Sequence, residues 1–143
     1  MADTHAKFIH EILDLVDKAK TKQEKIELLK RHDSMVLKNV LVGTFDDNIV
    51  WNVPDTPPPY VPADEFMPAS TLQKQLNQLL YFIKGNKGDN LMKVKRETMF
   101  IRLLEVIHPK DAKIVLAMVS KKLPVQGLTK ALVKEAFPNL IQK

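Results

Sequence analysis

Residues 119–141 read VSKKLPVQGLTKALVKEAFPNLI, and they contain the end of one predicted helix, a turn and a second predicted helix. Two lysines close the first helix, and Pro124 and Gly127 lie in the turn. The second helix begins at Leu128-Thr129 and stops before Pro138, since proline cannot continue a helix. This stretch therefore predicts two helices joined by a tight turn, and apolar periodicity upstream extends the all-α pattern over most of the chain.

The start of the second predicted helix is a candidate phosphate-binding site. The first N–H groups of a helix lack partners within the helix and carry partial positive charge, so they favour a nearby anion. Four lysines surround this start: Lys121, Lys122, Lys130 and Lys134. We name residues 121–134 the elbow. Two interpretations fit it, a phosphate-binding site and an ordinary helical hairpin with solvated lysines.

The net charge of the chain is unevenly distributed. Residues 1–69 carry 8 Lys and Arg against 12 Asp and Glu, whereas residues 70–143 carry 14 against 5. The two halves therefore have net charges of −4 and +9. Such asymmetry indicates either a basic face directed at a polyanion or a solvated lysine-rich surface.

Length and composition favour a globular protein. At 143 residues, 45% hydrophobic and 27% charged, residues 1–143 are expected to form a single domain. The absence of cysteine excludes disulfides, zinc–thiolate sites and thiol nucleophiles. No apolar run approaches the roughly 20 residues of a membrane span, and the N-terminus lacks a signal-peptide pattern. We therefore expect a cytoplasmic protein without a membrane partner.

Apolar residues at helical spacing predict a bundle of about seven helices. The predicted spans are roughly 4–20, 22–32, 35–42, 71–84, 91–107, 109–123 and 128–137.

Capping residues mark the starts of these helices. Thr21 and Glu24 have the spacing of a capping box, Asp33 or Ser34 precedes the third helix, and Ser70 precedes the fourth.

Gly43 and Gly85 are predicted to end the third and fourth helices, and Pro109 occupies a first-turn position that tolerates proline.

Residues 43–69 show no sustained hydrophobic period and are predicted to form a long Pro-rich irregular connection, in which residues 44–53 favour a short extended piece. The proline segment Pro54–Pro62 favours an extended, polyproline-like structure. It is either a structural connector or a protein-binding segment.

No constellation of metal ligands emerges. His10 and Asp14 are four residues apart and can share a helix face, which indicates a solvent-facing ion pair because no third ligand accompanies them. His108 with Asp111 fits helix-start capping better than a proton relay. The prediction is that the protein has no metal site.

Catalytic motifs are likewise absent from the sequence. It has neither a Walker-type phosphate loop nor a dinucleotide fingerprint, and GNKGDN at residues 85–90 favours a turn. The serines lack a nucleophile-elbow context. The acidic pairs Asp46-Asp47 and Asp64-Glu65 are expected to be solvated. We predict a protein that is not an enzyme and uses no cofactor.

Basic residues outside the elbow extend the candidate nucleic-acid surface. Lys84 precedes the 85–90 loop, Lys87 lies within it, and Lys93 and Arg96 lie on the fifth predicted helix. Such side chains bind phosphates and position a protein on nucleic acid without reading sequence. Because aromatic residues in the basic half fall mostly on apolar stripes, duplex backbone is favoured over single strands.

Residues 123–141, LPVQGLTKALVKEAFPNLI, resemble the ending of the N-terminal DNA-binding domain of phage-type ATP-dependent DNA ligases. Weaker similarity lies in residues 20–30 and in the Trp-then-proline segment from Trp51. The resemblance implies an all-helical domain that holds duplex DNA through backbone and minor-groove contacts. Carried onto this chain, it implicates Gly127, Leu128 and Thr129 in phosphate contacts, with the neighbouring elbow lysines beside them.

Two departures from the family pattern matter. Pro124 and the spacing before Gly127 differ from the tighter family turn, which changes the expected amide geometry. The family seals nicks through an adenylated lysine in a K-x-D-G motif, and KGDN at residues 87–90 is not this motif.

The sequence therefore predicts a non-catalytic duplex-DNA-binding module. We expect it to be an accessory in phage-type DNA metabolism and hence cytoplasmic within a host cell. About four to six phosphate contacts would give a log–log salt slope near −4 to −5. The alternative is a protein-interaction or virion-associated adaptor that keeps the scaffold, uses Pro54–Pro62 as its contact and does not bind DNA.

Overall fold

The computed structural model describes residues 8–53 and 59–141. Within them, the regular structure is helical, and the one extended pairing is an isolated antiparallel bridge between Trp51 and Ile83. The predicted all-α class is therefore confirmed. The elements are α1 (Ile9–Lys18), α2 (Lys22–Arg31), α3 (Met35–Phe45), α4 (Leu72–Gln75), α5 (Lys93–Val106), α6 (Pro109–Val119) and α7 (Lys130–Ala136), with the 3₁₀ helices η1 (Leu76–Phe82) and η2 (Lys87–Asn90).

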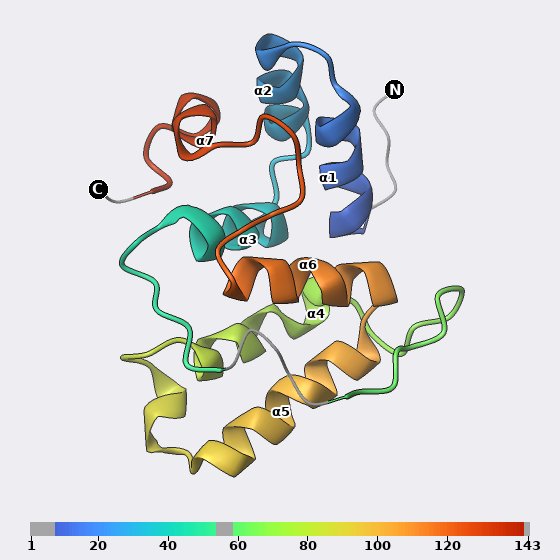
Figure 1. Cartoon of the computed structure of the whole chain (residues 1–143), viewed down its shortest axis with the longest axis vertical. Helices are drawn as coiled ribbons and strands as arrows, with labels where there is room; N and C mark the ends of the chain where they lie inside the picture. The colour runs from blue at the N-terminus through green and yellow to red at the C-terminus, as the bar shows by residue number, and fades with distance from the viewer. Residues whose placement is uncertain (1–7, 54–58, 142–143) are drawn as a thin grey trace.

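Helix α6 lies at the centre of the arrangement and packs against α1, α3 and α5 (Figure 1). Helix α2 contacts both α1 and α7, so these three helices gather on one side of α6, and α5 with η1 lies on the other. Buried apolar side chains from all these helices form a single cluster, which includes Val16, Leu41, Leu104 and Met118. None of the helices in the described ranges is long and apolar enough to cross a bilayer.

Several helix starts form as their sequence signals predict. The Thr21 hydroxyl accepts a hydrogen bond from the Glu24 N–H, and the Glu24 carboxylate accepts one from the Thr21 N–H, which completes a capping box. Ser34 caps α3, and Pro109 occupies the first turn of α6. The capping prediction at these positions is confirmed.

Gly43 does not end the third helix, since α3 continues to Phe45. A Cβ atom at this glycine would lie 2.6 Å from Cζ2 of Trp51 and 2.7 Å from Sδ of Met118. Glycine is therefore required here for close helix packing rather than for a turn.

The fourth helix also differs from its prediction. Thr71, rather than Ser70, is its N-cap, and α4 is only four residues long before the chain tightens into η1. The Asn52 N–H donates to the Phe82 carbonyl at 2.6 Å, and the Lys84 N–H donates to the Val50 carbonyl at 2.9 Å. These bonds hold the chain extended where an α-helix would otherwise continue, so tertiary pairing overrides the local helical pattern. The predicted turn at residues 85–90 contains η2.

The remaining differences lie at other helix ends. In the described residues the first helix covers Ile9–Lys18, α6 ends at Val119, and α7 starts at Lys130. The last two helices are therefore shorter than predicted, and the linker between them is longer.

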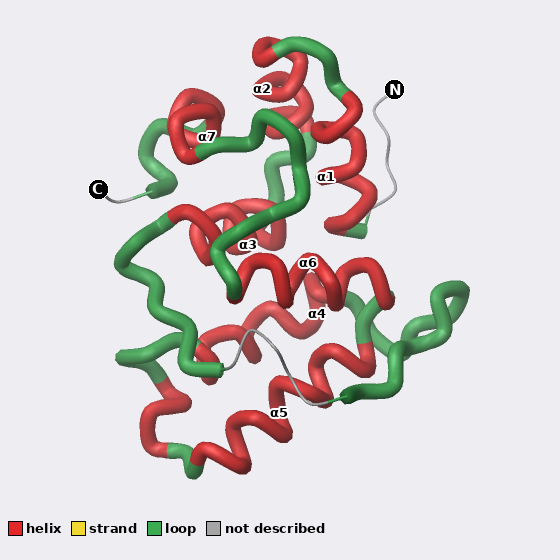
Figure 2. Tube along the Cα trace, in the orientation of Figure 1, coloured by secondary structure: helices red, strands yellow, loops and turns green. Residues whose placement is uncertain are grey.

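Within the described residues, the connection between α3 and α4 is non-helical, and so is a second long connection between α6 and α7 (Figure 2). Residues 54–58 of the predicted proline segment lie outside the described residues. Beyond them, the Val61 N–H donates to the Glu105 carboxylate at 2.8 Å, which ties the connection to α5.

Candidate nucleic-acid interface

The linker between α6 and α7 forms the body of the elbow. Lys121 adopts a left-handed conformation (φ 66°), and the N–H groups of Lys121 and Lys122 donate to carbonyls in the last turn of α6. Val125 and Leu128 are buried and anchor the linker to the core. The linker therefore has a defined path, and Lys122 projects from it as an exposed side chain.

Gly127 lies exposed over the junction of α1 and α2. Its φ of 72° favours glycine, and a Cβ there would lie 2.9 Å from Cε of Lys25. Lys25 is buried and donates to the Val16 and Ala19 carbonyls at 2.8 Å each, so it satisfies the C-terminal end of α1.

The next residues use their polar groups within the protein. The Gln126 N–H donates to Asp17 at 2.8 Å, and the Thr129 hydroxyl accepts from the Leu132 N–H at 3.2 Å as the α7 N-cap. Of the three residues that the ligase resemblance implicates, Leu128 is buried, while Gly127 and Thr129 are exposed.

Three elbow lysines gather around one carboxylate of the α3–α4 connection. Lys130 Nζ lies 3.0 Å from Asp47 Oδ2, and Lys121 Nζ donates to the Asp46 carbonyl at 2.8 Å. The pKa of Asp47 lies below its usual value, first because Lys130 hydrogen-bonds to it and adds positive charge, and further because Lys121 and Lys134 are close. Burial lowers the pKa of Lys121, although Asp46 and Asp47 oppose this shift.

These acidic partners were not expected from sequence. Asp46, predicted to be solvated, is buried and accepts a hydrogen bond from the Asn48 N–H at 2.8 Å. Asp47 remains solvated, as predicted, with 89% of its side chain exposed. No local signal links Asp47 to Lys130, because 83 positions separate them.

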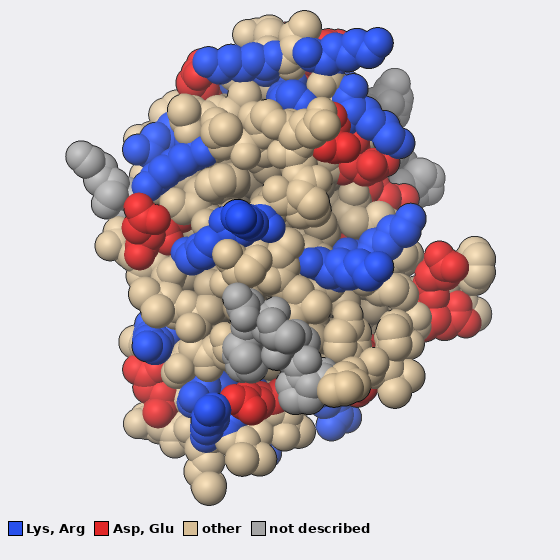
Figure 3. Space-filling model, in the orientation of Figure 1, with Lys and Arg blue, Asp and Glu red and all other residues tan. Residues whose placement is uncertain are grey.

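The view in Figure 3 shows Lys and Arg side chains over the α6–α7 linker and on both sides of it, with acidic groups between some of them. Lys122 and Lys134 are exposed and have no ion-pair partner among the described residues. These two lysines are consequently the elbow cations most open to an external anion.

The other predicted site residues do not join the elbow. Lys84 and Lys93 flank η2 near the start of α5, far from α7 (Figure 1). The side chain of Lys87 lies outside the described part. Lys93 Nζ is 3.9 Å from Glu97.

Arg96 is wrongly predicted as a phosphate contact, because only 9% of it is exposed. It donates to the Asn52 carbonyl at 2.9 Å and to the Gly88 and Leu91 carbonyls at 3.2 and 3.1 Å. Its guanidinium therefore holds the α3–α4 connection against the start of α5.

A histidine–aspartate cluster joins the starts of α1 and α6. His10 Nδ1 lies 2.7 Å from Asp111 Oδ1, which also accepts the His10 N–H at 3.0 Å. The predicted His10–Asp14 ion pair is therefore wrong, and Asp14 pairs with Lys18 at 3.0 Å instead.

His108 caps α6, as predicted, by accepting the Lys110 N–H at Nδ1 (3.0 Å). Its ring centroid is 4.3 Å from that of His10. Burial lowers the pKa of His108, and the charge of His10 lowers it further, against the opposing effects of Asp111 and Glu65.

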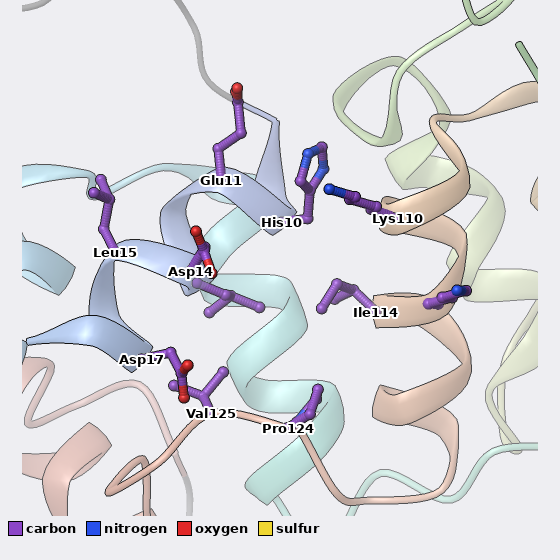
Figure 4. A pocket seen from close by; sticks show the side chains of 11 residues that line it. His10, Glu11, Asp14, Leu15, Asp17, Lys110, Ile114, Pro124 and Val125 are labelled. Atoms are coloured by element: carbon purple, nitrogen blue, oxygen red, sulfur yellow. The ribbon is translucent and has the colours of Figure 1, made fainter. Parts of the chain in front are cut away.

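A cavity of about 560 Å³ lies between α1 and α6 (Figure 4). His10 and Lys110 lie at one end, whereas Asp17 and Val125 lie at the other. Its charged lining residues have both signs, so it presents no single-sign field to a ligand. Across residues 8–53 and 59–141, no group of three or more His, Asp or Glu side chains is placed to hold a metal ion.

The model of a protein family of unknown function, DUF6433, matches residues 12–125. This match covers well over half of the chain. The chain belongs to the DUF6433 family. The DUF6433 match ends at Val125, so it includes Lys121 and Lys122 and leaves α7 beyond its end. A search of curated proteins finds no match.

Proposed function

We propose that this protein binds the backbone of duplex DNA through the elbow and does not catalyse a reaction. The observation that carries the proposal is that Lys130 pairs with Asp47 and Lys121 donates to the neighbouring Asp46 carbonyl, so cations from α7 and from the preceding linker share one surface. Lys134 lies within electrostatic reach of the same carboxylate. Lys122, exposed on the same linker, adds a fourth positive charge beside them.

Asp47 is an internal counter-charge that DNA can replace. Exposed ion pairs are screened by solvent and contribute little to stability, so a phosphate can displace the carboxylate from Lys130 at little cost. Release of counterions from DNA then favours binding without base contacts, and it makes affinity fall as salt rises. Four lysines correspond to a log–log salt slope of about −3 to −4, shallower than the sequence alone predicts because Arg96 and Lys93 lie elsewhere.

Fluorescence anisotropy with a labelled duplex tests the proposal. The double variant Lys122→Glu/Lys134→Glu changes exposed residues, and we expect it to weaken binding about tenfold or more at low salt. The control variant Lys74→Glu/Lys95→Glu alters the net charge equally at exposed residues outside the elbow, so it should weaken binding much less. Equal losses in the two variants would show that net charge, not the elbow, governs binding.

The ligase resemblance also favours duplex-DNA binding, and it suggests an accessory role in phage-type DNA metabolism. The resemblance concerns the stretch that forms the elbow and α7. A protein with this role and no nucleotidyltransferase motif would hold duplex DNA for other proteins.

A second function, a protein-interaction or virion-associated adaptor, is favoured by one observation. Phe66 and Met67, in the α3–α4 connection, are 85% and 81% exposed, and the Phe66 N–H donates to the Asp64 carboxylate at 2.8 Å. Ordered, exposed apolar side chains are typical of contact sites. A photoreactive residue at Phe66 that cross-links one protein in cells, combined with no DNA binding at low salt, would favour this function.

A further inference from the structure

A groove of about 320 Å³ lies between α3 and η1. Val42 of α3 and Leu80 of η1 contribute to its walls, together with Ile49 and Trp51 from the α3–α4 connection. This size and apolar lining are within the range of small-ligand sites.

The groove is neutral, in contrast to the charged surface around it. None of the described residues that line it is charged, and its polar side chains include the amides of Asn39, Asn77 and Asn86. The Asn39 amide nitrogen donates to the Met35 carbonyl at 2.8 Å, which leaves its carbonyl oxygen to accept and its second N–H to donate. Amides both donate and accept, which fits a ligand whose edge carries donors and acceptors side by side.

Trp51 places this groove beside the elbow. Trp51 and Ile49 line the groove and also line a neighbouring hollow that contains Asp47 and Lys121. The Trp51 Nε1–H donates to the Gly43 carbonyl at 2.9 Å, which fixes the indole. A ligand with an uncharged ring and an attached phosphate can therefore reach both hollows at once.

We infer that the groove between α3 and η1 binds an unpaired nucleobase. A base is flat and uncharged, stacks on aromatic side chains and carries hydrogen-bonding groups along one edge, and each of these properties has a counterpart in the groove. The choice of a nucleobase over another neutral ring rests on the proposed function, because the elbow supplies the phosphate contacts next to it. The protein would thus favour duplexes that contain an extrahelical base.

Two DNA probes isolate the contribution of the base. One is a duplex with a single-nucleotide bulge, and the other is the same duplex with an abasic residue at the bulge, so both carry the same phosphates. We expect the bulged duplex to bind about tenfold more tightly than the abasic one, since stacking of one base supplies a difference of this order.

Matched variants test whether the difference in affinity between the bulged and abasic duplexes arises in the groove. Leu80→Glu places a charge in the groove and should abolish the preference for the bulge, whereas Leu15→Glu on α1 should retain it. The two leucines are comparably exposed, at 38% and 39%, so each substitution places a carboxylate at a similar level of burial. A preference that survives in Leu80→Glu, or equal affinity of the wild-type protein for both duplexes, would overturn the inference.

Neutral nucleosides separate this inference from the proposed function. Trp51 is the only tryptophan of the chain, so its fluorescence reports on the groove directly. Saturable quenching by adenosine or cytidine that is independent of salt supports the base site even if duplex binding is absent. Salt-dependent duplex binding without bulge preference or quenching leaves the proposed function intact and removes the base site. Indole that binds as tightly as the nucleosides would show an apolar pocket without base recognition.

Discussion

At the scale of single residues, Asp47 is the carboxylate that most restrains the elbow. It lies 3.0 Å from Lys130 and within the electrostatic reach of Lys121 and Lys134. A nearby anion competes with DNA phosphates for these cations, so its removal should strengthen binding rather than weaken it.

We expect Asp47→Asn to raise duplex affinity at low salt about threefold to tenfold and to leave the log–log salt slope near −3 to −4, because the same four lysines contact phosphates without first giving up a carboxylate. A salt-titrated anisotropy measurement checks both values. Asp14→Asn is the control, since it removes another exposed ion pair, with Lys18, and changes the net charge by the same amount. An unchanged affinity in Asp47→Asn would place DNA elsewhere on the protein.

His108 should make stability depend on pH. Its pKa is lowered in the folded protein by burial and by His10, so at mildly acidic pH the unfolded chain binds more protons than the folded one. The stabilisation is fully present above the unfolded pKa near 6.5 and is lost as pH falls through the folded value. Protonation would also turn Nδ1 into a donor and remove the cap on the Lys110 N–H.

We therefore expect the free energy of unfolding to decrease from pH 7.5 to pH 5.5, as measured by urea denaturation at each pH. Asn is a good N-cap and does not titrate, so His108→Asn should reduce this pH dependence while keeping α6 capped. His10, Asp111, Glu65 and Lys110 also act on this site and remain in the variant. A pH dependence as large as that of the wild-type protein would assign the effect to those groups.

At the scale of helices, local signals in the sequence were sufficient where a helix start depends on its own residues. Thr21 with Glu24, Ser34 and Pro109 all act within one turn of the helix that they begin, which is why these starts could be predicted. Gly43 shows the limit of such signals. A glycine near the end of an apolar run resembles a helix stop, and only the distant Trp51 and Met118 reveal that it is a packing position.

Gly43→Ala tests which role is correct. At a helix interior that is free of contacts, alanine would stabilise by about 1 kcal/mol, but here its Cβ would lie within 3.0 Å of both Trp51 and Met118. We expect a net loss of about 1–3 kcal/mol in the free energy of unfolding, measured by urea denaturation with Trp51 fluorescence. Asn39→Ala, at an exposed position of the same helix, should change it by about 0.5 kcal/mol or less. A stabilised Gly43→Ala variant would contradict the close packing.

At the scale of the whole molecule, the sequence predicted the helical class and the basic elbow but not what faces that elbow. The uneven charge of the two halves indicated a basic face or a solvated lysine-rich surface, whereas folding brings Asp46 and Asp47 of the first half against Lys121 and Lys130 of the second. Arg96 could not be distinguished from a surface cation, because its three carbonyl acceptors lie in the α3–α4 connection, in η2 and just before α5. Such pairings depend on the tertiary fold and leave no periodic signal in the chain.

The central position of α6 predicts that the chain unfolds as one unit. Helix α6 packs against α1 on one side and α5 on the other, so neither group of helices keeps its apolar faces covered without it. Met118 is fully buried in α6, so Met118→Ala should destabilise the protein by about 2–5 kcal/mol, whereas Lys113→Ala on the exposed side should cost about 0.5 kcal/mol or less.

Two probes can follow this loss of stability in urea. Trp51 fluorescence reports on the groove beside η1, and far-ultraviolet circular dichroism reports on all helices. Coincident transitions that shift together in Met118→Ala are expected for a single domain. If the helical signal instead keeps a second transition after Trp51 has unfolded, then α1, α2 and α7 fold independently and the elbow rests on a unit of its own.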